Sequence, residues 1–416
     1  MWRTQARICS LSVTVLYITY DGLLDPLGPS QILPYIKGIS KHQDEVVIVS
    51  FEKSERLLHD KDALLSDLRN YSITWKPLLF TKGLGFLGKL MDLSRMYLMA
   101  FFITCKYNIK VVHARSHIPA QVGLFVKRIT KAKLIFDFRG LWVDERVDKG
   151  GWDLNHFFHR LQYKYYKRVE RKLLIQSDHV VVLTNKVVDE VIKLGAIEQS
   201  RITVIPCCAD YNHFPLSTDS HKVDAKISLG IPTDAFVLGY LGSIGRMYLL
   251  DRFFHLFKLA VNVRKDCHAL LITRDTSALK QLMESHLKPE LFSRVHVKSA
   301  SHNEVPILLP AIDVLVSFIF STYARQGASP TKMAECIASG IPVIANSGVG
   351  DVKQVIDRLD GGWIVDPFSD TELMEVVQNL DTICSKGGQR LRDASHSILG
   401  LEHANQCYQS VYDKLI

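Results

Sequence analysis

Short runs of β-branched and aromatic residues alternate with helical patterns along most of the chain. In the first half, the expected strands are 13–19 (VTVLYIT), 45–51, 111–114, 133–138 and 179–184. The stretches 30–42 and 118–130 between them have apolar residues at helical spacing. Apolar strands that alternate with helices are typical of a parallel sheet covered by helices.

This alternation pauses once and then starts again. Residues 206–222 are polar and rich in turn-forming residues, and further strands are expected at 236–245, 268–275, 294–298, 312–319, 341–346 and 361–366. We therefore predict an α/β fold with two Rossmann-like domains that face each other across a cleft. We place the first domain at 1–212, the second at 213–395, and a C-terminal helix that packs back on the first domain at 396–416. Open α/β sheets bind ligands at the carboxyl ends of their strands, so the chemistry is expected in the loops there.

Length and composition agree with this division. A chain of 416 residues suits two domains, and 47% hydrophobic with 23% charged residues is ordinary for a globular protein. No apolar run reaches the roughly 18–20 residues of a membrane helix. The basic and apolar beginning of the chain has some features of a signal peptide, but VTVLYITYDG is also typical of a buried first strand and its glycine turn. We favour the strand because no small-residue cleavage site follows.

Cysteine usage and charge narrow the class of protein further. The eight cysteines include no C-x-x-C pair, which favours a reducing, cytoplasmic location and predicts no structural zinc. Of the net charge of +8, residues 1–215 hold 31 Lys+Arg against 21 Asp+Glu, while the rest of the chain is slightly acidic. A basic first half indicates an anionic partner, such as a phosphorylated substrate or an acidic membrane surface.

The stretch GASPTKMAECIASGIPVIANSGVGD (327–351) has the strongest site pattern. Ser329 suits a helix cap, Pro330 and Thr331 the first turn, and Gly340 the end of the helix. Lys332 lies in the first turn, where a helix alone favours an acid, and this is understandable if the helix start binds a phosphate. Glu335 has apolar neighbours, and a ribose diol would give its carboxylate two donors. An ordinary capped helix with Glu335 facing solvent is the structural alternative.

SPTKMAECIASGIPVIA resembles the donor-site segment of glycosyltransferase family 4, which has the GT-B fold. The resemblance implies that Glu335 holds the nucleotide ribose. The first Glu of the family's Glu-x7-Glu motif falls on Gly327, so no side chain here can take a sugar-hydroxyl role. The resemblance also implies a retaining, metal-independent transferase that needs no cofactor and uses a nucleoside diphosphate sugar as co-substrate.

Other segments are similar to the family's glycine loops. YDGLLDPLGPSQILPYIKGISKH (20–42) resembles the loop after the first strand, which implies that Gly28 lies near the donor phosphates. FVLGYLGSIGRMYLLDRFFHLF (236–257) resembles the turn that opens the second domain, with Gly242 and Arg246 toward the diphosphate. The family usually places a Lys after that Arg, whereas Tyr248 and Leu249 occupy this region here.

The first domain is expected to bind the acceptor. VVHARSHIPAQVG (111–123) ends a strand and opens a helix, with Arg115, Ser116 and His117 at the exit. By resemblance His117 is the candidate catalytic residue, with His113, which is expected within the strand, as the competitor. Arg139 after the next strand joins Arg115 and Ser116 as acceptor-binding candidates. A structural Asp137–Arg139 pair and histidines with purely structural roles are the alternatives.

The function that we infer from the sequence is transfer of a sugar to a hydroxyl of a glycan or lipid-linked glycan. The basic, apolar stretches 85–110 and 159–174 indicate peripheral contact with an anionic membrane, and a packed helix with a solvated face is the alternative. Nucleic acid is not expected, since no reader motif accompanies the basic excess. A GT-B epimerase, or a binding subunit without catalysis, is the alternative function.

Overall fold

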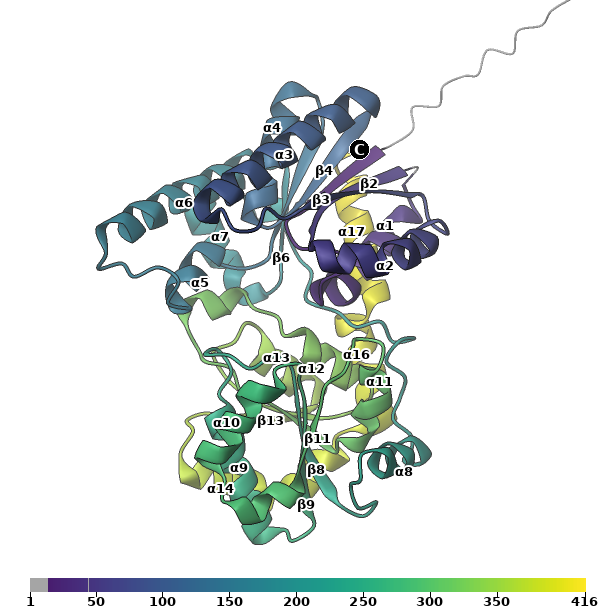
Figure 1. Ribbon diagram of the computed structural model, residues 1–416, viewed down its shortest axis with the longest axis vertical. Helices are drawn as coiled ribbons and strands as arrows, with labels where there is room; N and C mark the ends of the chain where they lie inside the picture. Colours follow the sequence, from purple (N-terminus) through teal and green to yellow (C-terminus); the bar gives the residue numbers. More distant parts are fainter. Residues whose placement is uncertain (1–13, 44) are drawn as a thin grey trace, which may run out of the picture.

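Two parallel β-sheets, one in each half of the chain, organise the structure (Figure 1). The computed structural model describes residues 14–43 and 45–416. Strand order is β3-β2-β1-β4-β5-β6-β7 in the first sheet and β10-β9-β8-β11-β12-β13 in the second, and every strand pairing is parallel. Each sheet reverses its winding beside its first strand, which is the doubly wound arrangement. The predicted fold class is confirmed.

The strands of the first sheet are β1 (Thr14–Thr19), β2 (Glu45–Glu52), β3 (Ile73–Leu79), β4 (Ile109–Arg115), β5 (Lys133–Phe138), β6 (His179–Val182) and β7 (Ile202–Val204). Those of the second sheet are β8 (Phe236–Leu241), β9 (Cys267–Ile272), β10 (Val295–Lys298), β11 (Val314–Ser317), β12 (Val343–Asn346) and β13 (Gly362–Val365). All the expected strands are present. The first begins at Thr14, and residue 13 lies outside the described part of the chain. Sequence reasoning missed β3 and β7, the half-buried strands at the two edges of the first sheet.

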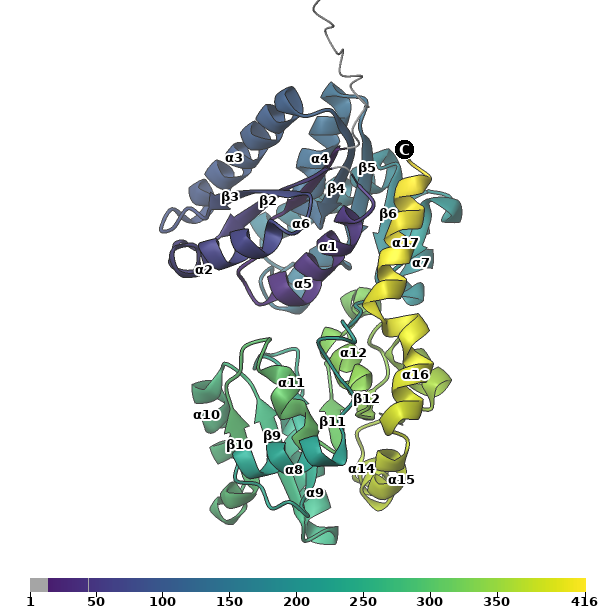
Figure 2. The same cartoon turned by 90° about the vertical axis from the view of Figure 1, so that its right-hand side faces the viewer.

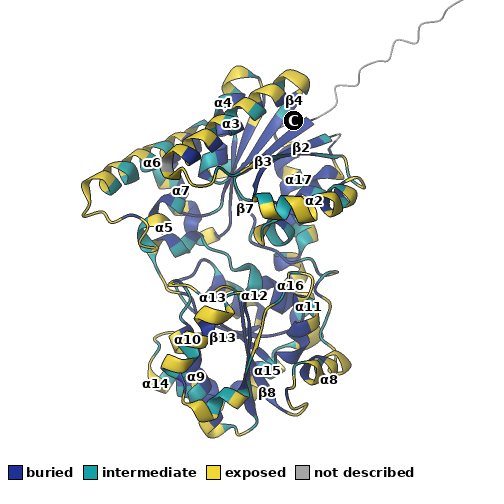
Figure 3. Cartoon of the chain, viewed as in Figure 1, coloured by how far each residue is buried: buried dark blue, intermediate teal, exposed yellow. Residues whose placement is uncertain are grey.

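Helices cover both faces of the first sheet. These helices are α1 (Leu33–Ser40), α2 (Ser54–Leu68), α3 (Gly85–Lys106), α4 (His117–Ile129), α5 (Trp142–Asp148), α6 (Phe157–Gln176) and α7 (Val188–Gly195). The core on one side takes side chains from α3, α4, α6 and α7, and the core on the other side takes them from α1, α2 and α17 (Leu401–Asp413). Both faces of the sheet are therefore covered, and its strands are coloured mostly as buried in Figure 3.

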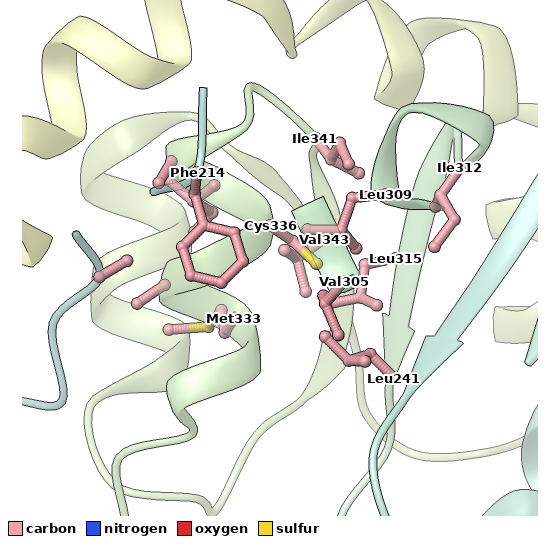
Figure 4. Close-up of a cluster of buried hydrophobic side chains, with 14 of the residues drawn as sticks. Phe214, Leu241, Val305, Leu309, Ile312, Leu315, Met333, Cys336, Ile341 and Val343 are labelled. Atoms are coloured by element: carbon pink, nitrogen blue, oxygen red, sulfur yellow. The ribbon is translucent and has the colours of Figure 1, made fainter. Parts of the chain in front are cut away.

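The second sheet is covered in the same way. Its helices are α8 (Asp219–Ser228), α9 (Leu250–Val263), α10 (Thr276–His286), α11 (Val305–Leu308), α12 (Thr331–Ala338), α13 (Val352–Leu359), α14 (Asp370–Gln378), α15 (Leu380–Ser385) and α16 (Gly388–Leu399). Met333 and Cys336 of α12 pack with Phe214 and strand residues such as Leu315 in one buried cluster (Figure 4). This packing fixes which face of α12 is left for a ligand.

The chain crosses between the two sheets at two places that lie together. The first crossing is the segment after β7, and the second joins α16 to α17 on the outside of the molecule (Figure 2). Two backbone hydrogen bonds tie these crossings together, at Ala209 and Leu399–Leu401. Ala209 N–H donates to the Leu399 carbonyl at 2.8 Å, and Leu401 N–H donates to the Ala209 carbonyl at 2.9 Å. From there α17 packs against α1, with the rings of Tyr35 and Tyr408 5.8 Å apart.

Among residues 14–43 and 45–416, no helix combines the length and the apolar character that crossing a bilayer requires.

Candidate functional site

The start of α12 faces the N-terminal domain. Within residues 14–43 and 45–416 no side chain caps this helix, and Pro330 occupies the cap position. The expectation that Ser329 would cap α12 is therefore wrong: its hydroxyl accepts a hydrogen bond from Cys207 N–H at 3.1 Å instead and ties the helix start to the interdomain linker. The helix ends as expected, with Gly340 at a φ of 78°. An uncapped helix start of this kind favours an anion.

Lys332 places its ammonium group at this helix start, where it has no hydrogen-bond partner among the described residues. The side chain is partly exposed, but Nζ itself is buried. It lies 4.1 Å from the ring centroid of Tyr248 and 4.7 Å from that of Tyr240. Burial lowers the pKa of Lys332 to about 7. An anion beside Nζ would supply the missing counter-charge and restore the protonated form.

Gly242 makes room for that ammonium group. It follows β8 with a φ of 137°, and a Cβ built on it would stand 3.1 Å from Lys332 Nζ. Any side chain at this position would be strained and would crowd the Lys. The turn after β8 and the start of α12 therefore lie against each other at the carboxyl ends of the strands.

Glu335 lies one turn further along α12, almost wholly buried, at 7% exposure. Its Oε1 is 3.4 Å from His302 Nε2, and the His302 ring stacks on His213 with centroids 4.7 Å apart. All three residues line an interdomain pocket of about 520 Å³. The solvent-facing alternative for Glu335 is therefore wrong. Sequence reasoning did not select His213, which lies in the polar stretch 206–222 between the domains, or His302, which lies in a loop between two expected strands.

Gln31 joins the two domains at the site, and sequence reasoning missed it. Its amide nitrogen donates to Thr331 Oγ1 at 2.7 Å, and its amide oxygen accepts from Arg115 and Arg139 at 3.0 and 3.1 Å. The predicted donor-site residue Thr331 and the predicted acceptor-site residues Arg115 and Arg139 therefore meet through one side chain. The only sequence signal for Gln31 is its place three residues after Gly28 in the first glycine loop.

A compact charged cluster lies on the N-terminal side of this bridge. Arg115 pairs with Asp21, and Arg139 lies 3.7 Å from Asp137. Burial alone would raise the pKa of Asp137, but Arg139, His113 and Arg115 together outweigh burial and leave this pKa below its ordinary value. The structural Asp–Arg pair that the sequence left open is therefore present. Ser116, next to it, has a φ of 73°, an uncommon conformation for a residue other than glycine.

His117 lies behind the cleft surface. Its Nε2 is 2.8 Å from Glu170 Oε2, its ring stacks on Trp142, and the residue is 1% exposed. Lys167 bridges Glu170 to Asp144 and completes a buried charge network. An acceptor hydroxyl therefore reaches neither ring nitrogen in this arrangement, and the geometry suits a positioning role for His117.

The other glycine-loop residues have distinct places. Gly28 is buried in a short π-helical turn, η1 (Gly28–Ile32), and a Cβ there would stand 1.8 Å from the Leu23 carbonyl oxygen. Only glycine fits this close approach. Arg246 is exposed and reaches toward the N-terminal domain, with Nη1 3.0 Å from the place of a Cβ on Gly150.

Gly327, the position without the expected carboxylate, is part of an interdomain contact. It ends the short helical turn η6 (Tyr323–Gly327), and a Cβ on it would stand 2.9 Å from Gly140 Cα in the N-terminal domain. Thr184 Oγ1 donates to the carbonyl of the preceding residue, Gln326, at 2.5 Å. The loop thus lies directly against the other domain, and the space that a Glu would need is filled by backbone.

Lys332 and the start of α12 suit a diphosphate, with Glu335 one turn further along the helix. Fixed positive charge and an uncapped helix start suit an anionic leaving group, and Glu335 suits a neighbouring diol. No cluster of three or more His, Cys, Asp or Glu with the geometry of a metal site occurs in the described residues.

Comparisons with known proteins agree with this architecture. Residues 35–213 match the model of Glycosyltransferase Family 4. Lipopolysaccharide glucosyltransferase WaaG of Escherichia coli (strain K12) is 25% identical over 229 residues, which are 53% of this chain and 59% of WaaG. The match thus spans about three fifths of that curated relative.

Solved structures extend the likeness over nearly the whole chain. HepE of Anabaena in complex with UDP and glucose has a TM-score of 0.71 at 16% identity, covering 97% of this chain and 100% of HepE. Sucrose-phosphate synthase of Thermosynechococcus elongatus has a TM-score of 0.71 at 14% identity, covering 97% and 99%. The fold is thus the GT-B architecture of glycosyltransferases. Within this class, residues 35–213 are similar to glycosyltransferase family 4.

Proposed function

We propose that this protein is a retaining glycosyltransferase that moves a sugar from a nucleoside diphosphate sugar to a hydroxyl of a glycan or lipid-linked glycan. The observation that carries the proposal is the buried ammonium group of Lys332 beside Gly242, for which the described part of the chain supplies no hydrogen-bond partner. A buried cation without a counter-charge is unfavourable, and a diphosphate at the helix start would supply two.

The remaining donor contacts follow from that placement. Glu335, one turn along the same helix, would accept hydrogen bonds from the ribose diol, while Thr331 and the backbone at Gly242 would border the phosphates. Gly28 allows the first glycine loop to pass close to them. Arg246 would approach the diphosphate only by swinging away from Gly150, and we assign it to closure around the donor.

Chemistry at this site would rest on fixed electrostatics. Departure of the nucleoside diphosphate leaves negative charge on its terminal phosphate, and Lys332 with the start of α12 would stabilise it. The same phosphate would take the acceptor proton while the acceptor attacks from the same face, which retains the configuration of the sugar. The protein then needs no cofactor or metal and no general base; Arg115, Ser116 and Arg139 would orient the acceptor.

The relatives support this choice of substrates. HepE was solved with UDP and glucose and with UDP-glucose, and WaaG is named a lipopolysaccharide glucosyltransferase. We therefore propose a nucleotide sugar as donor, a glycan or glycolipid as acceptor, no nucleic-acid partner, and a cytoplasmic position at the inner face of the membrane.

Thermal shift with a panel of nucleotide sugars tests the donor site, since a bound ligand raises apparent stability. The best ligand is then incubated with the protein, and release of nucleoside diphosphate is measured with and without candidate glycan acceptors. Acceptor-dependent release supports the transferase. Binding without release, in every acceptor tested, would instead favour a non-catalytic binding subunit.

A further inference from the structure

Helix α3 has an apolar stripe that no part of the described chain covers. The stripe consists of Leu87, Leu90, Met91, Leu98, Phe101 and Phe102, with Phe102 64% exposed. Their spacing places them on one face of the helix. The opposite face packs into the core through Met96, Ala100 and Ile103. A helix that is apolar on both faces but covered on only one lacks a partner for the other.

Helix α6 adds to the same side of the N-terminal domain. Helix α4 packs against both α3 and α6, and all three lie together on one side of the sheet (Figures 1 and 3). The exposed apolar residues at the beginning of α6 are Phe157, Phe158, Leu161 and Tyr165, with Phe158 69% exposed. We call the exposed faces of α3, α4 and α6 the outer face.

The charge of the outer face has one sign. The two acidic residues on the three helices, Asp92 and Glu170, are both buried. The exposed basic residues include Lys89, Lys106, Arg160, Lys164, Arg168 and Lys172. Apolar side chains interleaved with positive charge, without exposed acid, complement an anionic bilayer, whose headgroups attract the bases while its interior accepts the apolar groups.

The outer face is also connected to the cleft. The segment 149–156 runs from Gly150, beside Arg246 of the other domain, to the exposed Phe157 at the start of α6. A partner bound to the outer face would therefore lie close to the rim of the site.

We propose that the outer face docks on an anionic lipid bilayer and so presents the cleft to a membrane-held acceptor; the acceptor part of this statement rests on the proposed function. The bases approach the headgroups, and Phe102 and Phe158 enter the interfacial region.

The test uses the full chain and vesicles, and it needs no transferase activity. Binding is measured by co-sedimentation with vesicles of about 30% phosphatidylglycerol in phosphatidylcholine, and with phosphatidylcholine alone. We expect binding to the anionic vesicles that weakens with salt, and little binding to the neutral ones. Absence of binding to anionic vesicles, or equal binding to both kinds, would overturn the proposal.

Two sets of variants locate the surface. Arg160→Glu/Lys164→Glu/Arg168→Glu changes three residues that form no ion pair with the described residues, and we expect vesicle affinity to fall at least about 100-fold, at about fivefold for each lost charge. Lys265→Glu/Lys280→Glu/Lys288→Glu makes the same charge change on the C-terminal domain and should retain far more affinity. Phe102→Ser/Phe158→Ser should weaken binding about tenfold, while the equally exposed pair Val263→Ser/Ile307→Ser should not.

Other partners for the outer face, a second copy of the chain or RNA, would give different results in these experiments. Dimerisation that Phe102→Ser/Phe158→Ser abolishes, without vesicle binding, would assign the outer face to a second copy of the chain. Tighter binding to RNA than to vesicles would assign it to nucleic acid, and either result overturns the proposal. Nucleotide-sugar binding and turnover with a soluble acceptor should be unchanged in the α6 variant. If the wild type binds anionic vesicles but shows no turnover, this result would contradict the proposed function and leave the docking proposal intact.

Discussion

The lowered pKa of Lys332 predicts that donor binding takes up a proton. In the unliganded protein burial brings this pKa to about 7, so about half of the molecules carry the charge at pH 7. A diphosphate beside Nζ favours the charged form and raises the pKa well above this value. The affinity for a nucleoside diphosphate sugar should therefore fall by about tenfold between pH 6 and pH 8, and level off below pH 6.

Isothermal titration with UDP-glucose measures this effect directly. Its diphosphate is esterified at both ends and does not titrate in this range, so the protein alone supplies the pH dependence. Titrations in two buffers of different ionisation enthalpy should show uptake of about half a proton at pH 7 and nearly one at pH 8.

Two substitutions serve as the controls. Lys332→Met should remove the proton uptake and, at pH 6, weaken binding by about 10- to 100-fold, the contribution of one charged hydrogen bond. Uridine binding should change little, because the nucleoside has no phosphate. Lys280→Met, on the exposed face of α10, should behave as the wild type. An affinity for UDP-glucose that is independent of pH in the wild type, or equal losses for UDP-glucose and uridine in Lys332→Met, would refute the phosphate contact.

The remaining predictions concern single contacts. Lys332 binds fewer protons in the folded protein than in the unfolded protein, so the free energy of unfolding should rise from pH 7 toward pH 10. Lys332→Met should therefore raise the midpoint of thermal unfolding, most strongly at pH 7 or below. A midpoint that does not rise in this variant would contradict the buried charge. Glu335→Ala should abolish transfer while thermal unfolding stays cooperative, and wild-type turnover would remove its ribose role. Gly327→Ala should destabilise the contact between the two domains by about 1–3 kcal/mol and increase the radius of gyration in small-angle scattering. Gly245→Ala, with open space around it, should leave the radius of gyration unchanged. Tyr412→Phe removes the 2.8 Å hydrogen bond to His113 and should lower the free energy of unfolding in urea by about 1–3 kcal/mol, against little change for the exposed Tyr165→Phe.

The sequence predicted central strands better than edge strands. Strands buried on both faces read as continuous apolar runs, which is why β1, β2 and β5 were found to within about two residues. In contrast, β3 contains Lys76 and Pro77 and is half-buried, and β7 is three residues long. Neither has the apolar continuity on which the prediction depends.

For the site, the sequence predicted the residues of one continuous segment but not the contacts between segments. Thr331, Lys332 and Glu335 share one helix, so their spacing alone placed them near each other. Gln31 meets Thr331 only because two domains face each other, a distance of 300 residues along the chain. The hydroxyl of Ser329 likewise accepts a hydrogen bond from the linker instead of capping the helix. A tertiary donor can compete with the N–H groups of a helix start for the same side-chain oxygen.

The tie between Ala209 and Leu399–Leu401 limits how the two halves of the molecule can move. Because both connecting segments are hydrogen-bonded to each other at a single point, sliding or separating the halves would break backbone pairing there. Rotation about this point would not. A small rotation at this pivot would separate Gly140 from Gly327, where the two domains are in contact, and so open the cleft for a sugar to enter and a spent nucleotide to leave. Substitutions at the pivot, although they touch no substrate, should therefore alter the rate of product release.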